Sequence, residues 1–175
     1  FLASSHTVYE WSLKEEMQIK NTAIETLWLQ SLQNGIASGQ VLGGNLCSFN
    51  LLQGTSYMPD LNNSILFLED DDLVWEYFPR EFDRNLTSLI QQPWFEWVKW
   101  IIFGRFQKNA FMNADILRQI VTSKIELKNM PILMNANFGH IYPIATIPIW
   151  WYLEILAWER SEIKFISSSK YWWCS

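Results

Sequence analysis

Two residues capable of acid–base chemistry each follow an apolar, strand-like run of this sequence. Glu69 comes directly after the run 65–68, and His140 ends the segment 131–140. A carboxylate that orients an imidazole, together with an imidazole that moves a proton, supplies two of the three members of a hydrolytic triad. These residues therefore indicate part of a hydrolytic active site, and no convincing nucleophile accompanies them.

The same residues have structural interpretations that their spacing leaves open. Glu69 begins the acidic run 69–72, and such runs are often solvated turns. A metal site would need more ligands, and only His6 and His140 are available as imidazoles, so we expect neither a metal nor a cofactor. His140 could equally be a structural histidine. Gly139 permits a close backbone approach and favours the functional interpretation.

The elements around these residues follow an α/β pattern. Buried-type strands are predicted at 40–45, 65–68, 98–103 and 131–135, with further strands at 147–149, 152–157 and 162–166. Between them, helices are predicted from Leu46 toward a stop at Gly54, over 80–92, and from the N-cap Asn113 to about Lys128. Open α/β sheets place reacting groups at the carboxyl ends of their strands, where Glu69 and His140 are expected.

The helical periodicity also predicts which side chains face the core. The inward residues of the helix over 80–92 are Phe82, Leu86, Leu89 and Ile90. Those of the helix after Asn113 are Ile116, Leu117, Ile120, Val121 and Ile125.

Composition narrows the class of protein. A net charge of −5 gives no basic surface, so we expect no nucleic-acid partner. The apolar runs are too short or too interrupted to cross a bilayer, and Cys47 and Cys174 indicate no disulfide framework, so a cytoplasmic protein without a membrane partner is expected. The first residue is Phe1 rather than Met, and we expect that an N-terminal portion is missing.

Several blocks, spread over most of residues 40–158, resemble the C-terminal half of the LD-carboxypeptidase family, serine peptidases that include the microcin C immunity proteins. The blocks are GGNLCSFNLLQGTSYMPDLNNSILFLEDDD, EFDRNLTSLIQQP, IFGRFQK, NFGH and ATIPI. The second block is more similar to the microcin-immunity branch than to the muramoyl-tetrapeptide branch. The resemblance implies a small α/β domain of the swivelling type at 40–166, with a connector and domain edge at 1–39 and a tail at 167–175.

The resemblance also implies a Ser–Glu–His triad, with its glutamate at Glu69 and its histidine at His140. The family carries its serine on a strand-to-helix elbow of an N-terminal Rossmann-like domain, which we expect to be absent from this chain. No serine here has a Gly-x-Ser-x-Gly-like setting. The chain is thus expected to be the inactive half of an enzyme. The alternative is a degenerate homologue or binding module that keeps the fold without a complete triad.

The implied substrate is a peptide or a peptidyl-nucleotide near a free carboxyl terminus. Asn45 and Arg105 are candidate substrate-binding residues because each ends a predicted strand. Asn45 could instead only cap the following helix, and Arg105 could be a structural ion pair. The sequence leaves a murein tetrapeptide and a peptide-nucleotide antibiotic open as substrates. The expected partners are the N-terminal domain of the same protein and, in a homodimer, a second copy.

The chain contains 11 tryptophans, an unusually high number, and only 7 glycines. Relatives in the family usually have glycine near the positions of five of these residues, namely Trp94, Trp97, Trp100, Trp150 and Trp151. Trp75, Trp158, Trp172 and Trp173 fit the same pattern. Glycine serves where φ is positive or backbones approach closely, and tryptophan suits neither. We hypothesise that these codons are UGA, read as glycine in the host, and that a chain containing tryptophan has a strained loop at 150–151. A genuine aromatic binding surface is the alternative.

Overall fold

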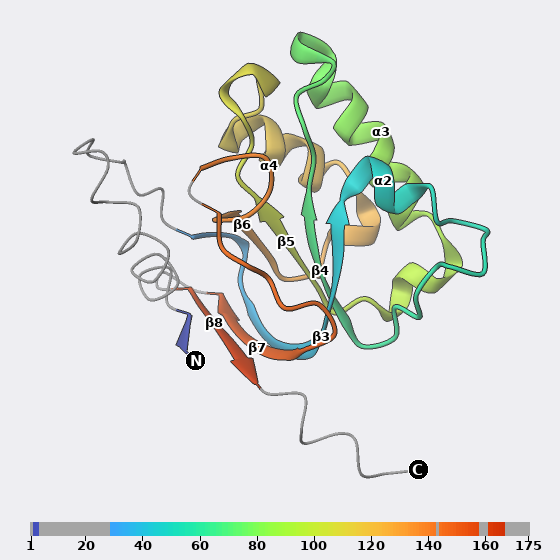
Figure 1. The fold of residues 1–175 in the computed structure, drawn as a ribbon, viewed down its shortest axis with the longest axis vertical. Helices are drawn as coiled ribbons and strands as arrows, with labels where there is room; N and C mark the ends of the chain where they lie inside the picture. Colours follow the sequence, from blue (N-terminus) through green and yellow to red (C-terminus); the bar gives the residue numbers. More distant parts are fainter. Residues whose placement is uncertain (1, 4–28, 143, 158–160, 167–175) are drawn as a thin grey trace.

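The computed structural model describes residues 2–3, 29–142, 144–157 and 161–166 (Figure 1). The predicted tail at 167–175 and most of the predicted connector lie outside these residues. So do His6, Trp158, Trp172, Trp173 and Cys174.

A mixed β-sheet organises the described part of the chain. Its eight strands have the order β1-β8-β7-β3-β4-β5-β6-β2. The central parallel strands are β3 (Gly35–Asn45), β4 (Ser64–Glu69), β5 (Trp100–Gly104) and β6 (Ile132–Ala136). The antiparallel strands are β7 (Tyr152–Ala157), β8 (Glu162–Ile166) and β1 (Leu2–Ala3) on one side, and β2 (Gln30–Gln33) on the other. The predicted α/β class is confirmed.

Two strand predictions need correction. β3 begins at Gly35 rather than at residue 40, because Gly35–Gln40 pairs with β7 in a register that the apolar pattern does not reveal. The strand predicted at 147–149 is wrong, since these residues lie in a loop before β7. Pro148 cannot donate a ladder hydrogen bond, and the backbone of Trp150 instead donates to the carbonyl of Val41 at 2.9 Å.

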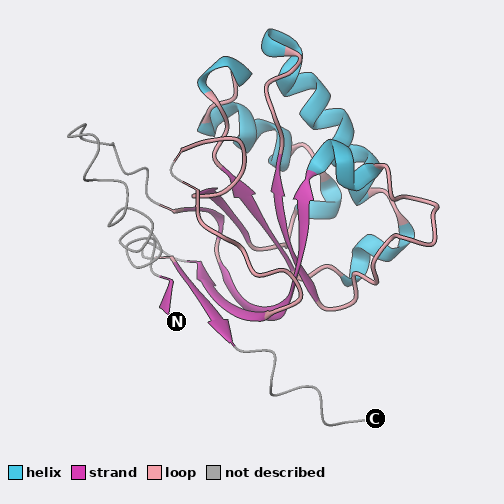
Figure 2. Cartoon of the chain, in the orientation of Figure 1, coloured by secondary structure: helices cyan, strands magenta, loops and turns pink. Residues whose placement is uncertain are grey.

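Helices cover one face of the parallel strands (Figure 2). They are α2 (Leu46–Asn50), α3 (Phe78–Ile90) and α4 (Ala114–Thr122), with shorter 3₁₀ turns η1 (Trp75–Tyr77), η2 (Pro93–Trp97), η3 (Lys108–Ala110) and η4 (Ile125–Leu127). All four predicted inward residues of α3 are buried. Asn113 caps α4 as predicted, its side chain accepting a hydrogen bond from the backbone N–H of Ile116.

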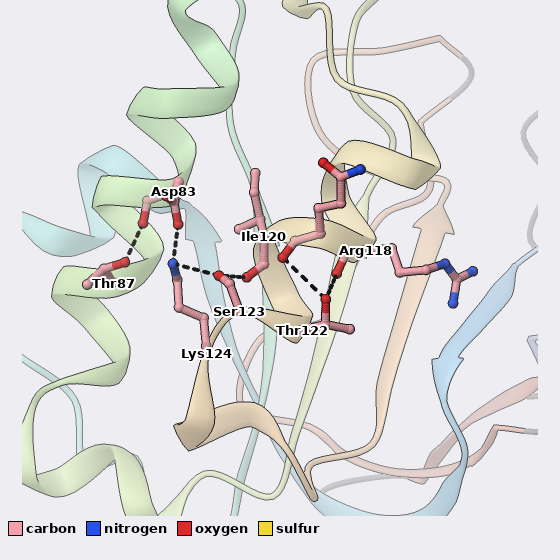
Figure 3. Close-up of polar contacts among 8 residues, drawn as sticks. Asp83, Thr87, Arg118, Ile120, Thr122, Ser123 and Lys124 are labelled. Atoms are coloured by element: carbon pink, nitrogen blue, oxygen red, sulfur yellow. Dashed lines mark hydrogen bonds and ion pairs between the residues drawn. The ribbon is translucent and has the colours of Figure 1, made fainter.

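α4 ends at Thr122, short of the predicted Lys128, and Ile125 is therefore 74% exposed rather than inward. The hydroxyls of Thr122 and Ser123 donate to carbonyls of the last turn, at 2.8 Å to Arg118 and 2.7 Å to Ile120. Lys124 then turns away with an extended backbone, and its ammonium group pairs with Asp83 on α3 (Figure 3). This ion pair ties the end of α4 to α3, and Leu127 is the buried residue of the η4 turn that follows.

Two apolar clusters fill the two faces of the sheet. The helix-side cluster packs α3 and α4 against residues such as Leu66, Ile101 and Phe103. The second cluster joins the other face of the parallel strands, including Phe67 and Ile102, to residues of β7 and β8. β7 and β8 thus cover the face that the helices leave open. Burial on both faces accounts for the continuous apolar runs of the parallel strands.

Three tryptophans occupy positions that suit tryptophan poorly. Trp150 has φ +70° and Trp75 has φ +50°, both in the left-handed region that favours glycine. Trp100 is fully buried, and its indole N–H has no hydrogen-bond partner among the described residues. The expected strain at 150–151 is therefore found at Trp150, although the codon hypothesis itself stays a prediction.

Candidate active site

The sequence-predicted residues gather at one edge of the sheet, where the parallel strands end. Asn45 is the last residue of β3 and Glu69 the last residue of β4, and the two are paired in register. Gly104 ends β5, and β6 ends at Ala136, shortly before His140. Because the strands are parallel, residues distant in sequence meet at this carboxyl edge.

Glu69 and His140 are in direct contact. Nδ1 of His140 lies 2.7 Å from Oε2 of Glu69. The Glu69 side chain is 10% exposed and that of His140 is 47% exposed. An ionised carboxylate only accepts hydrogen bonds, so Nδ1 carries the hydrogen and Nε2 of the neutral ring is left as the acceptor. This is the tautomer that a general base requires in a triad.

The surrounding charge favours the protonated imidazole. The hydrogen bond to Glu69 is the main cause that raises the pKa of His140 above its ordinary value of 6.5, and partial burial opposes it. The negative charges of Glu69, Asp71 and Asp70 raise this pKa further. The site therefore stabilises an imidazolium, the species that forms when His140 accepts a proton.

Two glycines leave the space that the Glu69 side chain occupies. Gly139 has φ +102°, and a Cβ there would lie 2.9 Å from Oε2 of Glu69. A Cβ on Gly104 would lie 2.7 Å from the carbonyl oxygen of Phe138 and 3.0 Å from Cβ of Glu69. Contacts under 3.0 Å force a neighbour to move, so a Cβ at Gly139 would displace the Glu69 carboxylate and a Cβ at Gly104 would displace the backbone of Phe138.

Asn45 caps α2 and also reaches the acidic turn. Its Oδ1 accepts a hydrogen bond from the backbone N–H of Ser48 at 2.9 Å. Its Nδ2 donates to Oδ1 of Asp70, also at 2.9 Å. The capping role foreseen as the alternative is thus present, and it coexists with a position beside Glu69.

Arg105 lies farther along the same edge. Its backbone N–H donates to the carbonyl of Ala136 at 3.1 Å, and its guanidinium group donates to the carbonyl of Tyr142 at 3.4 Å. The structure thus brings Arg105 to the loop that follows His140. A guanidinium group here connects the end of β5 to the loop that holds the imidazole.

Asp70 and Gly104 are the site residues that sequence reasoning missed. Asp70 is 6% exposed, although it reads as one member of a solvated acidic run. The available signal was its place just past the apolar run 65–68, which predicts a buried strand. Among the described residues, no group of three His, Cys, Asp or Glu side chains is arranged to hold a metal ion.

The described part of the chain is thus an α/β domain that presents a glutamate–histidine pair at the carboxyl edge of its sheet. The model of the LD-carboxypeptidase C-terminal domain family matches residues 38–155, and the chain belongs to this family.

Individual relatives agree with this assignment. The chain is 47% identical over 118 residues to the "Putative carboxypeptidase YocD" of Bacillus subtilis, an alignment covering 67% of this chain and 35% of that protein. The chain spans about a third of the length of the curated relatives it matches.

Solved structures share the fold. A protein of Bacillus anthracis that is similar to MccF, the microcin C7 self-immunity protein of Escherichia coli, superposes with a TM-score of 0.81 at 39% identity. The match covers 89% of this chain and 47% of that one. An MccF-like protein of Streptococcus pneumoniae, in complex with AMP, matches with a TM-score of 0.65 at 25% identity, covering 79% of this chain and 44% of that one.

In the described part of the chain, no helix is long and apolar enough to cross a membrane.

Proposed function

We propose that this chain supplies the glutamate and the histidine of a Ser–Glu–His triad in a serine-type LD-carboxypeptidase. The observation that carries the proposal is the 2.7 Å contact between Nδ1 of His140 and Oε2 of Glu69 at the carboxyl edge of the sheet. The contact fixes the imidazole in the tautomer that leaves Nε2 free to accept a proton.

The proposed reaction begins when Nε2 of His140 accepts the proton of a serine hydroxyl, as that oxygen attacks the carbonyl of the scissile amide. Glu69 holds the ring in place and stabilises the imidazolium that forms. His140 then donates the proton to the leaving amine, and the amide bond breaks. Water then attacks the acyl-enzyme ester while His140 accepts its proton, and His140 returns this proton to the serine oxygen as the ester bond breaks and the second product leaves.

The serine and the oxyanion hole are proposed to lie on an N-terminal domain of the same protein, which is the expected partner of this one. The present chain alone is then expected to be inactive. A homodimer and a cytoplasmic location stay predictions.

The proposed substrate is a peptide or a peptidyl-nucleotide with a free carboxyl group near the scissile amide. Asn45 is proposed to donate a hydrogen bond to the substrate from its place beside Glu69. Arg105 is proposed to act nearby, either as a cation for the substrate carboxyl group or by holding the loop after His140. The AMP bound to the related protein supports a nucleotide-bearing substrate, and a Bacillus subtilis relative named a murein peptide carboxypeptidase supports a murein peptide.

The test uses the protein encoded by the complete reading frame. It is incubated with a murein tetrapeptide and, separately, with an aminoacyl sulfamoyl adenosine or a similar peptidyl-nucleotide, and the released products are measured. Cleavage of either substrate supports the proposal and identifies the substrate class. A reading frame without a serine-bearing domain, or a full-length protein that cleaves neither substrate, favours the non-catalytic homologue instead.

A further inference from the structure

Asp70 is a buried carboxylate that the proposed triad does not use. It is 6% exposed and follows Glu69 directly at the end of β4. Its Oδ1 accepts two hydrogen bonds, from Nδ2 of Asn45 at 2.9 Å and from the backbone N–H of Asp71 at 3.1 Å. Burial of a carboxylate costs free energy, and burial is the main cause that raises the pKa of Asp70. The two hydrogen bonds oppose this effect.

Two hydrogen bonds, one at each end, fix how the amide of Asn45 faces. The backbone N–H of Ser48 needs an acceptor, so the oxygen of the Asn45 amide must point toward α2. The NH₂ group then points toward Asp70, which accepts one of its two hydrogens. Both ends of the amide are fixed, and its second N–H has no acceptor among the residues that the structure describes.

The second N–H of Asn45 lies at the same end of the sheet as Glu69, the proposed triad glutamate. Asn45 and Glu69 are register partners at the ends of β3 and β4, and Asn45 is only half-buried. A donor held in one orientation loses less conformational entropy on binding than a freely rotating amide does. Asp70 can therefore improve substrate binding without touching the substrate.

We propose that Asp70 is a positioning residue whose carboxylate orients the Asn45 amide, so that the second Asn45 N–H donates to an acceptor oxygen of the peptide substrate beside Glu69. This inference rests on the proposed carboxypeptidase function. It gives the acidic turn a role distinct from that of Glu69, which acts on His140.

Steady-state kinetics of the full-length protein, with whichever of the two substrates it cleaves, tests the inference. Asp70→Ala is expected to raise KM about tenfold and to leave kcat within about threefold, the scale of one hydrogen bond lost from substrate binding. Asn45→Ala should raise KM at least as much, and the double variant should be no worse than Asn45→Ala alone. Asp70→Asn keeps an acceptor oxygen and should retain a KM within about threefold of wild type.

Asp71→Asn is the matched control, because it removes one negative charge from the same turn while an amide oxygen can still accept the hydrogen bond from Leu73. Its KM should change by less than about twofold, as expected where no substrate-directed hydrogen bond is lost. If the effects of Asp70→Ala and Asn45→Ala on KM multiplied in the double variant, or if Asp70→Ala left KM unchanged, this inference would be overturned and the proposed function would stand. A wild-type protein that cleaves neither substrate would overturn the proposed function, and with it the substrate part of this inference.

A second measurement does not depend on activity or on the folding of Asp70→Ala. In ¹⁵N NMR spectra of this chain, one Nδ2 hydrogen of Asn45 should be shifted downfield, protected from exchange, and sensitive to the titration of Asp70. Two rapidly exchanging Asn45 hydrogens that ignore this titration would show that Asp70 does not orient the amide.

Discussion

Nδ1 of His140 lies 2.7 Å from Oε2 of Glu69, although the two residues are 71 positions apart in sequence. The contact forms because β4 and β6 run parallel, on either side of β5, and end at the same edge of the sheet. The sheet therefore supplies the geometry, and the local sequence at each strand end supplies the chemistry.

The first prediction concerns the charge of His140. Its pKa is raised in the folded protein by the hydrogen bond to Glu69, so protonation of His140 stabilises the fold. This contribution is fully present below the unfolded pKa of 6.5 and is lost as pH rises through the folded pKa. NMR titration should show His140 protonated at a higher pH than an unperturbed histidine.

Glu69→Gln is the control for this titration, because it removes the charge that favours the imidazolium. The pKa of His140 should fall in this variant. In the wild-type protein, the free energy of unfolding should exceed that of His140→Gln by an amount that shrinks as the pH rises above 6.5. A His140 pKa that is the same with Glu69 and with Gln at this position would contradict the assigned cause.

The second prediction concerns Gly139. Gly139→Ala adds a Cβ at φ +102° and 2.9 Å from the Glu69 carboxylate. We expect the variant to lose about 1–3 kcal/mol of stability through backbone strain and crowding, and the full-length enzyme to lose about 100-fold in kcat through a displaced carboxylate. Chemical denaturation and steady-state assays measure the two effects.

Gly54→Ala is the matched control for Gly139→Ala. Gly54 also has a positive φ, +75°, but a Cβ there meets nothing within 4 Å. It should cost about 1 kcal/mol of stability and leave kcat unchanged. If Gly54→Ala reduced kcat as strongly as Gly139→Ala, the loss would reflect general destabilisation rather than the position of Glu69.

The third prediction concerns Trp150. At φ +70° this residue is strained and its side chain is 54% exposed, so Trp150→Gly should raise the free energy of unfolding by about 1 kcal/mol. Its neighbour Trp151 is not among the residues with positive φ, and Trp151→Gly should lower stability instead. Thermal or denaturant unfolding of the two variants measures the difference, and equal losses of stability would show that residue 150 has no preference for glycine.

The fourth prediction concerns the gene. If glycine is the residue made in the host, the codons at positions 75, 100 and 150 should be UGA rather than UGG. Sequencing the gene decides this directly, and UGG at these positions would refute the hypothesis. Mass spectrometry of the native protein should likewise show glycine at each UGA position.

The amino-acid sequence predicts the local elements well where one pattern dominates. The apolar run of β4 is continuous because it is buried on both faces, and the amphipathic pattern of α3 places Phe82 and Leu86 inward as found. The helix predicted after Asn113 extends beyond the observed end of α4, because periodicity does not detect the contacts that end it. These contacts are the hydrogen bonds from the hydroxyls of Thr122 and Ser123 and the ion pair of Lys124 with Asp83.

The candidate site was predicted only in part, because its contacts depend on the order of the strands. Glu69 and His140 were found from their place after apolar runs and from the family resemblance. The contact between Asn45 and Asp70 requires β3 and β4 to be adjacent and parallel, which neither local sequence shows. The need for glycine at Gly104 likewise depends on Phe138, which approaches it from a distant segment.

The central claim is that Glu69 and His140 act as one catalytic unit, and kinetics of the full-length protein test it most directly. His140→Ala and Glu69→Gln should each lower kcat by at least about 1,000-fold. The double variant should be little worse than His140→Ala, since members of a triad act together. Circular dichroism should show that both variants are folded. Folded variants that retain wild-type kcat would contradict the account.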